Sequence, residues 1–161
     1  MIEHHDIVFT LNGRSVTATV EARISLVDLL RECFGLTGTH VGCEHGVCGA
    51  CNVMMHGRSV RSCLMLAVQA DGAEIETIEG MTGRQVIGDL QREFVARNAL
   101  QCGYCTPGML ATAAELLAQQ RKLSRQDIRD ALSGNYCRCT GYQAIVDAIE
   151  AVAARRSDAA S

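Results

Sequence analysis

Two stretches decide how the chain is organised: Gln101-Cys102-Gly103-Tyr104-Cys105-Thr106-Pro107-Gly108 and Cys137-Arg138-Cys139-Thr140-Gly141. Each presents two cysteines directly before a segment with helical spacing of apolar residues. Helix N-termini expose main-chain N–H groups and the positive end of the helix dipole, which lower thiol pKa values and stabilise anionic sulfur. We call Cys102, Cys105, Cys137 and Cys139 the second cysteine set. Four thiolates presented by two loops favour a metal or cluster site.

A first cysteine set lies upstream, where Cys43, Cys48, Cys51 and Cys63 have the spacing C-x4-C-x2-C-x11-C. This spacing is that of plant-type [2Fe–2S] sites. Gly42, Gly46 and Gly49 lie beside these cysteines and allow main-chain conformations and close approaches to sulfur that a Cβ would prevent. We therefore predict that the three glycines help to bind the cofactor. His45 is expected to be a loop residue, because four cysteines already suffice.

Zinc is the alternative occupant of both sets. Structural zinc sites usually show paired cysteine knuckles, often with histidine, and three cysteines within nine residues fit that pattern poorly. In the second set, C-x-x-C alone would also suit a redox dithiol, but that motif is expected beside a βαβ unit and this region is helical. Taken as one set, the four thiols fit a second [2Fe–2S] cluster.

The N-terminal part has strand periodicity. Ile7, Phe9 and Leu11 alternate, and Asn12-Gly13 favours a tight hairpin before the next alternating run. Ser25 and Asp28 form a helix-start signature. Beyond the hairpin we expect a helix over 26–34, strands over 52–56, 59–62 and 75–78, and a short helix near 64–70. A small sheet with a helix on one face is an α+β arrangement.

From Gly80 the apolar residues recur at helical spacing. Thr106 is the expected N-cap of one helix, with Pro107 at its first position, and Ser124 with Asp127 starts another. The tail from Arg155 is expected to fray. The helical faces predicted to be buried are Ile87/Leu90/Phe94, Leu110/Ala113/Leu117, Ile128/Ala131/Leu132 and Ile145/Ala148/Ile149/Val152. Four such helices predict a small bundle, so we expect domains at 1–79 and 80–161.

Composition narrows the class of protein. The chain of 161 residues has a net charge of −3 and no basic run with interleaved aromatic residues, which disfavours nucleic-acid binding. No apolar run approaches the ~20 residues that span a bilayer, and the first residues lack a secretion-signal pattern. We therefore expect a soluble, cytoplasmic protein without membrane insertion, in which nine cysteines indicate metal or redox chemistry.

Cys33 is the ninth cysteine and belongs to neither set. It falls in the expected helix over 26–34, on or near its packed side. We interpret it as a small buried hydrophobic residue.

Three motifs resemble one family. Gly42–Cys51 (G-C-E-H-G-V-C-G-A-C), Leu100–Met109 (L-Q-C-G-Y-C-T-P-G-M) and Asn135–Tyr142 (N-Y-C-R-C-T-G-Y) are similar to the iron–sulfur subunit of the molybdenum hydroxylases, the xanthine oxidase family. The resemblance covers roughly residues 5–153. It implies a plant-ferredoxin-like β-grasp domain followed by a four-helix bundle. It also implies that each cysteine set binds one [2Fe–2S] cluster.

The resemblance implies partners as well. A large subunit would hold the molybdopterin cofactor, with Gln101 and Cys139 at the positions that approach the pterin, and a medium subunit would hold FAD. The complex would be a dimer of heterotrimers, and this chain, without a catalytic residue of its own, would relay electrons between the two cofactors. The alternatives are a free-standing two-cluster ferredoxin-type carrier and a zinc-stabilised adaptor. A large apolar interface would distinguish the subunit from the free-standing carrier. The colour of the protein would distinguish it from the zinc-stabilised adaptor, because zinc is colourless.

Overall fold

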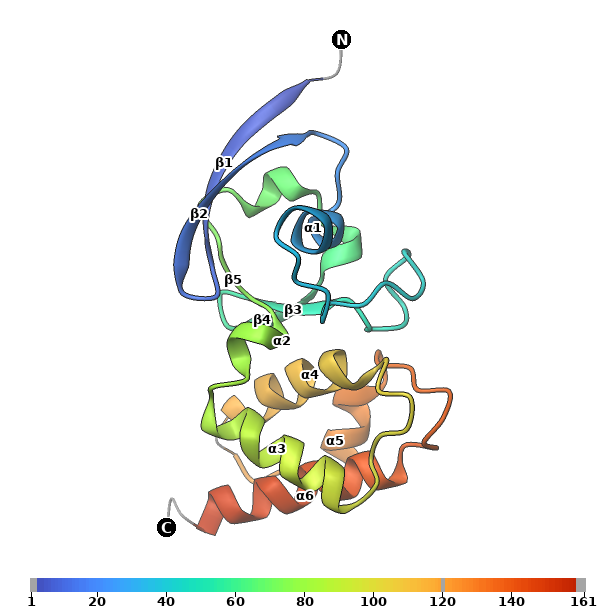
Figure 1. Ribbon diagram of the computed structural model, residues 1–161. Helices are drawn as coiled ribbons and strands as arrows, with labels where there is room; N and C mark the ends of the chain where they lie inside the picture. Colours follow the sequence, from blue (N-terminus) through green and yellow to red (C-terminus); the bar gives the residue numbers. More distant parts are fainter. Residues whose placement is uncertain (1–2, 120, 159–161) are drawn as a thin grey trace.

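A mixed sheet and a group of helices follow one another along the chain (Figure 1). The computed structural model describes residues 3–119 and 121–158. The strands are β1 (His4–Leu11), β2 (Arg14–Glu21), β3 (Asn52–Met55), β4 (Arg58–Arg61) and β5 (Glu74–Glu76). The α-helices are α1 (Leu26–Asp28), α2 (Ile78–Met81), α3 (Gln85–Ala96), α4 (Thr106–Ala118), α5 (Arg125–Leu132) and α6 (Gln143–Asp158). Three further turns are η1 (Leu29–Cys33), η2 (Ser62–Leu64) and η3 (Ala67–Ala70). The predicted order of an α+β sheet domain and a helical bundle is confirmed.

The described part of the sheet has five strands in the order β2-β1-β5-β3-β4. β1 and β2 form the predicted hairpin, with Asn12 (φ 51°) and Gly13 (φ 78°) in the left-handed conformation that this tight turn requires. β5 runs parallel to β1 and antiparallel to β3, and so joins the hairpin to the second strand pair. The expected strand over 75–78 is shorter, because Ile78 already begins α2.

The first helix covers one face of the sheet. Ser25 caps it by accepting a hydrogen bond from the Asp28 amide, as predicted. After Asp28 the helix continues as the wide π turn η1, in place of a regular helix to Phe34. Leu26, Leu29 and Leu30 pack in the core, but Cys33 ends the turn and is exposed. The interpretation of Cys33 as a buried residue is therefore wrong, because the sheet covers only the earlier part of this segment.

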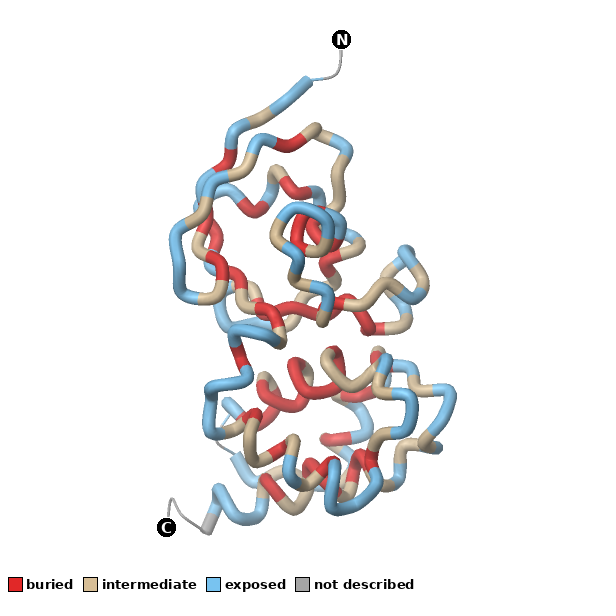
Figure 2. Tube along the Cα trace, viewed as in Figure 1, coloured by how far each residue is buried: buried red, intermediate tan, exposed pale blue. Residues whose placement is uncertain are grey.

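Helices α3 to α6 pack around a second core. The predicted faces are buried, apart from the half-buried Ala131 (Figure 2). Thr106 is the first helical residue and Cys105 precedes it as N-cap, so the prediction of Thr106 as the cap is wrong by one position. Residues 155–158 do not fray, since α6 continues to Asp158 and Arg155 forms an ion pair with Glu93 on α3. The rest of the predicted tail, residues 159–161, lies outside the described residues.

The two cores meet between the sheet and α4. Met54 of β3 is buried in the core of the helical part. Gly108, in the first turn of α4, packs so closely on the main chain of Gly49 that a Cβ there would overlap the Gly49 carbonyl oxygen. The glycine-rich loop that precedes β3 is thereby held against the beginning of α4. No described helix is long and apolar enough to cross a membrane.

Candidate metal centres

The first cysteine set lies in a loop that folds back on itself. Gly46 (φ 82°) and Gly49 (φ 73°) adopt the left-handed conformation, and a Cβ at Gly42 would lie 3.0 Å from the sulfur of Cys48. The amide nitrogen of Cys48 lies 3.5 Å from the sulfur of Cys43. η2 carries Cys63, whose thiol hydrogen-bonds with that of Cys51. Gly42 thus lets the main chain approach sulfur closely, as expected, whereas a Cβ at Gly46 would meet Leu64 and one at Gly49 would meet Gly134.

Contacts among these thiols divide the first set into two pairs. Although desolvation raises it, hydrogen bonds from main-chain amides, including those of His45 and Cys48, lower the pKa of Cys43 to about 6. The Cys48 thiol, whose pKa is raised by desolvation, hydrogen-bonds to Cys43. Desolvation and then a hydrogen bond with Cys51 raise the pKa of Cys63 to about 11. The pairs are therefore Cys43 with Cys48, and Cys51 with Cys63.

The second cysteine set joins the beginning of α4 to the loop before α6. The sulfurs of Cys102 and Cys139 are 3.6 Å apart, and both residues are exposed. Cys105 and Cys137 are half-buried and form the other pair through a thiol hydrogen bond. The side-chain amide of Gln101 donates to the Cys139 carbonyl at 3.0 Å. Gln101 therefore lies beside the exposed pair.

Hydrogen bonds give the two thiols of the half-buried pair opposite pKa shifts. Desolvation and then the hydrogen bond with Cys137 raise the pKa of Cys105 to about 12. Although desolvation opposes it, the hydroxyl and amide of Thr140 lower the pKa of Cys137. The Thr140 hydroxyl donates at 3.1 Å and its amide at 3.4 Å to the Cys137 sulfur. Cys137 therefore has the lower pKa of the two thiols in this pair.

The arrangement of two pairs fits a [2Fe–2S] cluster in each set, because a pair of thiolates binds each of the two irons. A single zinc ion would need its ligands to converge on one point. The donor type, the pairing and the amide contacts to sulfur therefore favour a two-iron cluster over zinc.

Direct contacts join the two sets. The main-chain amide of Tyr136 donates a 2.8 Å hydrogen bond to the carbonyl oxygen of Cys48. Nearby, the rings of His40 and Tyr104 stack with centroids 4.4 Å apart, and the Tyr104 hydroxyl donates to the Val41 carbonyl at 2.7 Å. Both cysteine loops are thus fixed to each other by groups next to the candidate ligands.

A partly buried chain of polar side chains supports this contact. Asn52 donates to the Thr112 hydroxyl at 2.9 Å, which donates to Asn135 at 3.1 Å. Arg61 extends the chain from the sheet, with a 2.5 Å hydrogen bond to Asn52 and a 2.7 Å hydrogen bond to the Gly134 carbonyl. Asn52, Arg61 and Asn135 lie one or two positions from Cys51, Cys63 and Cys137 in the sequence. They therefore determine how the two sets face each other.

Sequence reasoning singled out neither Thr140 nor the residues of this polar chain. Thr140 directly follows Cys139, so its place in the motif was a usable signal. Asn135 opens the same motif and carries the same signal, whereas Arg61 and Thr112 carry none, because their partners lie far away in the sequence. A ring nitrogen of His45 hydrogen-bonds to the carbonyl oxygen of Cys43.

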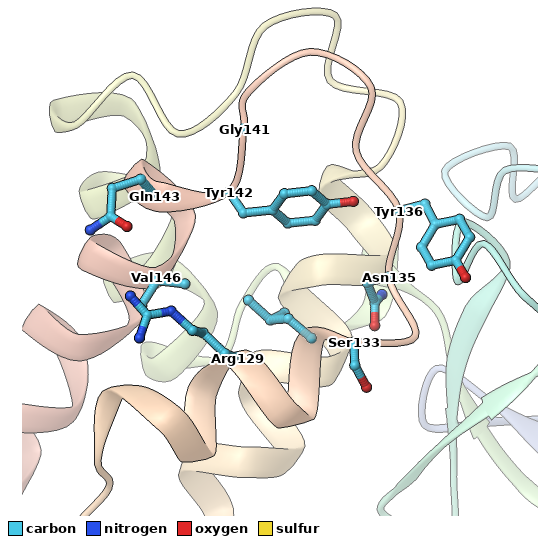
Figure 3. Close-up of a pocket in the computed structure, with 9 residues that line it drawn as sticks. Arg129, Ser133, Asn135, Tyr136, Gly141, Tyr142, Gln143 and Val146 are labelled. Atoms are coloured by element: carbon cyan, nitrogen blue, oxygen red, sulfur yellow. The ribbon is translucent and has the colours of Figure 1, made fainter.

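A cavity of about 310 Å³ adjoins the second set (Figure 3). It lies between the end of α5, the beginning of α6 and the loop that carries Cys137. Tyr142 points across it towards the segment of Tyr136, and its hydroxyl accepts a 2.8 Å hydrogen bond from the Cys137 amide. The cavity belongs to the surroundings of this cysteine loop.

Comparison with protein families gives the class of protein. Residues 9–79 match the family model of the 2Fe-2S iron-sulfur cluster binding domain, and residues 77–150 match that of a second [2Fe-2S] binding domain. Each match contains one cysteine set in full. The sheet domain is thus ferredoxin-like, and the fold and sites define an iron–sulfur protein with two [2Fe–2S] domains.

Individual relatives narrow this class. The chain is 49% identical over 151 residues to the caffeine dehydrogenase subunit gamma of Pseudomonas sp. (strain CBB1), covering 92% of this chain and 90% of the relative. It is 50% identical over 139 residues to the nicotine 6-hydroxylase small subunit of Paenarthrobacter nicotinovorans, covering 86% and 84%. The crystal structure of quinoline 2-oxidoreductase from Pseudomonas putida 86 matches with a TM-score of 0.89 and 50% identity, over 96% of this chain and 97% of that chain. The chain belongs to the small [2Fe–2S] subunits of the molybdenum hydroxylases, and so is a subunit of an oxidoreductase complex.

Proposed function

We propose that this chain relays electrons, one at a time, between a molybdopterin centre on a large subunit and FAD on a medium subunit. Two bound [2Fe–2S] clusters would supply the one-electron chemistry. The first cysteine set would hold the cluster nearer the flavin and the second set the cluster nearer molybdenum. The hydrogen bond from the Tyr136 amide to the Cys48 carbonyl is the observation that carries the proposal.

That hydrogen bond supports a short route between the two sets. Cys48 belongs to the first set, and Tyr136 is the direct neighbour of Cys137 in the second. The route from one sulfur to the other runs along two cysteine side chains, a few main-chain bonds and this single 2.8 Å hydrogen bond. The stacked rings of His40 and Tyr104 fix the same two loops, so the route does not depend on a chance approach of mobile segments.

Exposure supports the assignment of the second set to the molybdenum side. Its Cys102 and Cys139 are exposed, whereas Cys105 and Cys137 are half-buried and Cys137 adjoins the link to the first set. Gln101 lies at the exposed pair through its bond to Cys139. We propose that Gln101 and Cys139 contact the pterin, and that the complex is a dimer of heterotrimers. Two relatives, the caffeine dehydrogenase subunit gamma and the nicotine 6-hydroxylase small subunit, are themselves subunits, which supports a multi-subunit complex.

We propose domains at 1–79 and 80–161, supported by the family matches over 9–79 and 77–150. A cytoplasmic location stays a prediction from the sequence.

Metal analysis of the intact complex tests the function. Iron, acid-labile sulfide and zinc are measured per copy of this chain, and EPR spectra are recorded after reduction with dithionite. Two clusters require about four iron and four sulfide, with two distinguishable signals. Zinc without sulfide would exclude electron transfer by this chain. About two iron with one signal would exclude a relay through two clusters.

A further inference from the structure

The Thr140 hydroxyl is directed at a sulfur atom of the second cysteine set. It lies 3.1 Å from the sulfur of Cys137 and the Thr140 amide lies 3.4 Å from the same atom. Among the described residues, Thr140 is the one whose hydroxyl hydrogen-bonds to a cysteine sulfur. The first set shows a main-chain contact instead, from the Cys48 amide to Cys43 at 3.5 Å.

The surroundings of Thr140 orient its hydroxyl hydrogen. The Tyr142 amide donates a 3.2 Å hydrogen bond to the hydroxyl oxygen of Thr140. Because this oxygen accepts from Tyr142, the hydroxyl hydrogen of Thr140 is left to point at the Cys137 sulfur. The Tyr142 hydroxyl in turn accepts from the Cys137 amide at 2.8 Å (Figure 3). Thr140 is itself half-buried, so water competes only in part for this hydrogen. The donor is therefore held in place before any electron arrives.

A donor at a ligand sulfur favours the reduced form of a cluster. One-electron reduction adds one negative charge, part of which is carried by the ligand sulfurs, and a hydroxyl hydrogen pointing at a sulfur stabilises that charge. We propose that Thr140 is a positioning residue, whose hydroxyl raises the reduction potential of the cluster bound by the second cysteine set. The proposal rests on the proposed function, because it requires that set to hold a [2Fe–2S] cluster.

The test is a redox titration of the intact complex followed by EPR, with dithionite as the electron donor. Thr140→Val removes the hydroxyl at nearly unchanged size, and Thr140→Ser keeps it. The second-set signal is identified as the one that Cys139→Ser removes or alters. The midpoint potential of this signal is expected to shift to a more negative value in Thr140→Val and to remain at the wild-type value in Thr140→Ser. The first-set signal is expected to keep its potential in both variants.

Tyr142→Phe is the matched control for loop position. It removes the hydroxyl that holds the Cys137 amide but leaves both Thr140 donors to the sulfur. An equal negative shift in Tyr142→Phe would overturn the proposal, because the position of the loop would then set the potential. An unchanged potential in Thr140→Val, with both clusters present, would overturn it as well.

A further variant, Thr140→Ala, is used if the valine variant loses the second cluster. Thr140→Ala removes the hydroxyl without placing a methyl group against the sulfur, and its potential is then compared with that of Thr140→Ser. If both apolar variants lose the second cluster while the serine variant keeps it, the hydroxyl serves assembly and the proposal is wrong. If wild-type complex lacks a second cluster, the proposed function itself fails, which separates the two failures.

Discussion

The guanidinium group of Arg61 on β4 donates a 2.7 Å hydrogen bond to the carbonyl oxygen of Gly134, which lies between α5 and Cys137. The same side chain donates to the Gly46 carbonyl at 3.2 Å and to Asn52 at 2.5 Å. One residue of the sheet domain thus binds the loops of both cysteine sets. A charged, half-buried donor with three acceptors is costly to remove, since its acceptors are left without partners.

We expect Arg61→Met to destabilise the chain by about 2–4 kcal/mol, which corresponds to a fall in melting temperature of roughly 5–15 °C. Thermal unfolding followed by circular dichroism measures the change. Arg58→Met is the control, because Arg58 lies on the same strand, its side chain is 85% exposed, and it forms a long ion pair of 3.9 Å with Glu115. Its expected cost is below about 0.5 kcal/mol. Equal effects of the two substitutions would mean that the Arg61 contacts do not hold the loops.

The contact between Gly108 and Gly49 makes a second prediction. We expect Gly108→Ala to destabilise the chain by about 1–3 kcal/mol, because the added Cβ meets main-chain atoms that no side-chain rotation can move. Gly88→Ala on α3 is the matched control, with only the Arg92 side chain at 3.6 Å from the new Cβ. Alanine there is expected to stabilise by about 0.5–1 kcal/mol. Chemical unfolding of both variants measures these opposite signs, and a stabilised Gly108→Ala variant would contradict the close packing.

Local patterns made most of the fold predictable. Asn12-Gly13 and the Ser25/Asp28 signature each specify a turn or a cap through their own side chains and main-chain preferences, so both appear in the structure as expected. The spacing of the cysteines likewise indicates two sets of four. Cys33 was misplaced, because the widening of the helix into η1 and the limited cover by the sheet are tertiary effects.

The contacts between the two sets were not predictable in the same way. The hydrogen bond from Tyr136 to Cys48 joins main-chain atoms, and main-chain groups are the same in every residue. The close packing of Gly108 on Gly49 depends on how two domains meet, which periodicity does not encode. The positions of the sites were therefore visible in the sequence, whereas their relative placement needed the structure.

Glu93 links α3 to α6 and predicts a pH dependence. Its carboxylate accepts hydrogen bonds from Arg155 at 2.6 Å and from Arg97 at 2.8 Å, which lower its pKa below the ordinary 4.5. A lowered pKa contributes stability above the ordinary pKa, and this stability is lost as the pH falls through the lowered value. We therefore expect Glu93→Gln to cost about 0.5–1 kcal/mol at pH 7 and progressively less below about pH 4.5.

Urea unfolding of wild type and Glu93→Gln between pH 3 and 7 measures this difference. Arg155→Met in both backgrounds is the control, because the ion pair predicts that the second substitution costs little once the first is made. A stability difference that does not change with pH would show that packing of the side chain, and not its charge, supports the two helices.

The two-domain arrangement predicts that the clusters can be lost separately. In Cys139→Ser, we expect the intact complex to lose or alter the second-set EPR signal and to stop turnover, while the first-set signal persists. Its iron content should fall from about four to about two per chain if the second cluster is lost. The first set should be unaffected, since its four cysteines belong to the sheet domain and its loop contacts the second set through main-chain atoms that serine leaves unchanged.

Cys33→Ala is the control for this experiment. Cys33 is exposed and ends η1, so its removal is expected to leave both EPR signals and about four iron per chain unchanged. A loss of either signal in Cys33→Ala would place the ninth cysteine among the ligands and contradict the two sets of four. A folded Cys139→Ser chain that lost both signals together would instead show that the first cluster depends on the second, because two independent domains would each retain their own cluster.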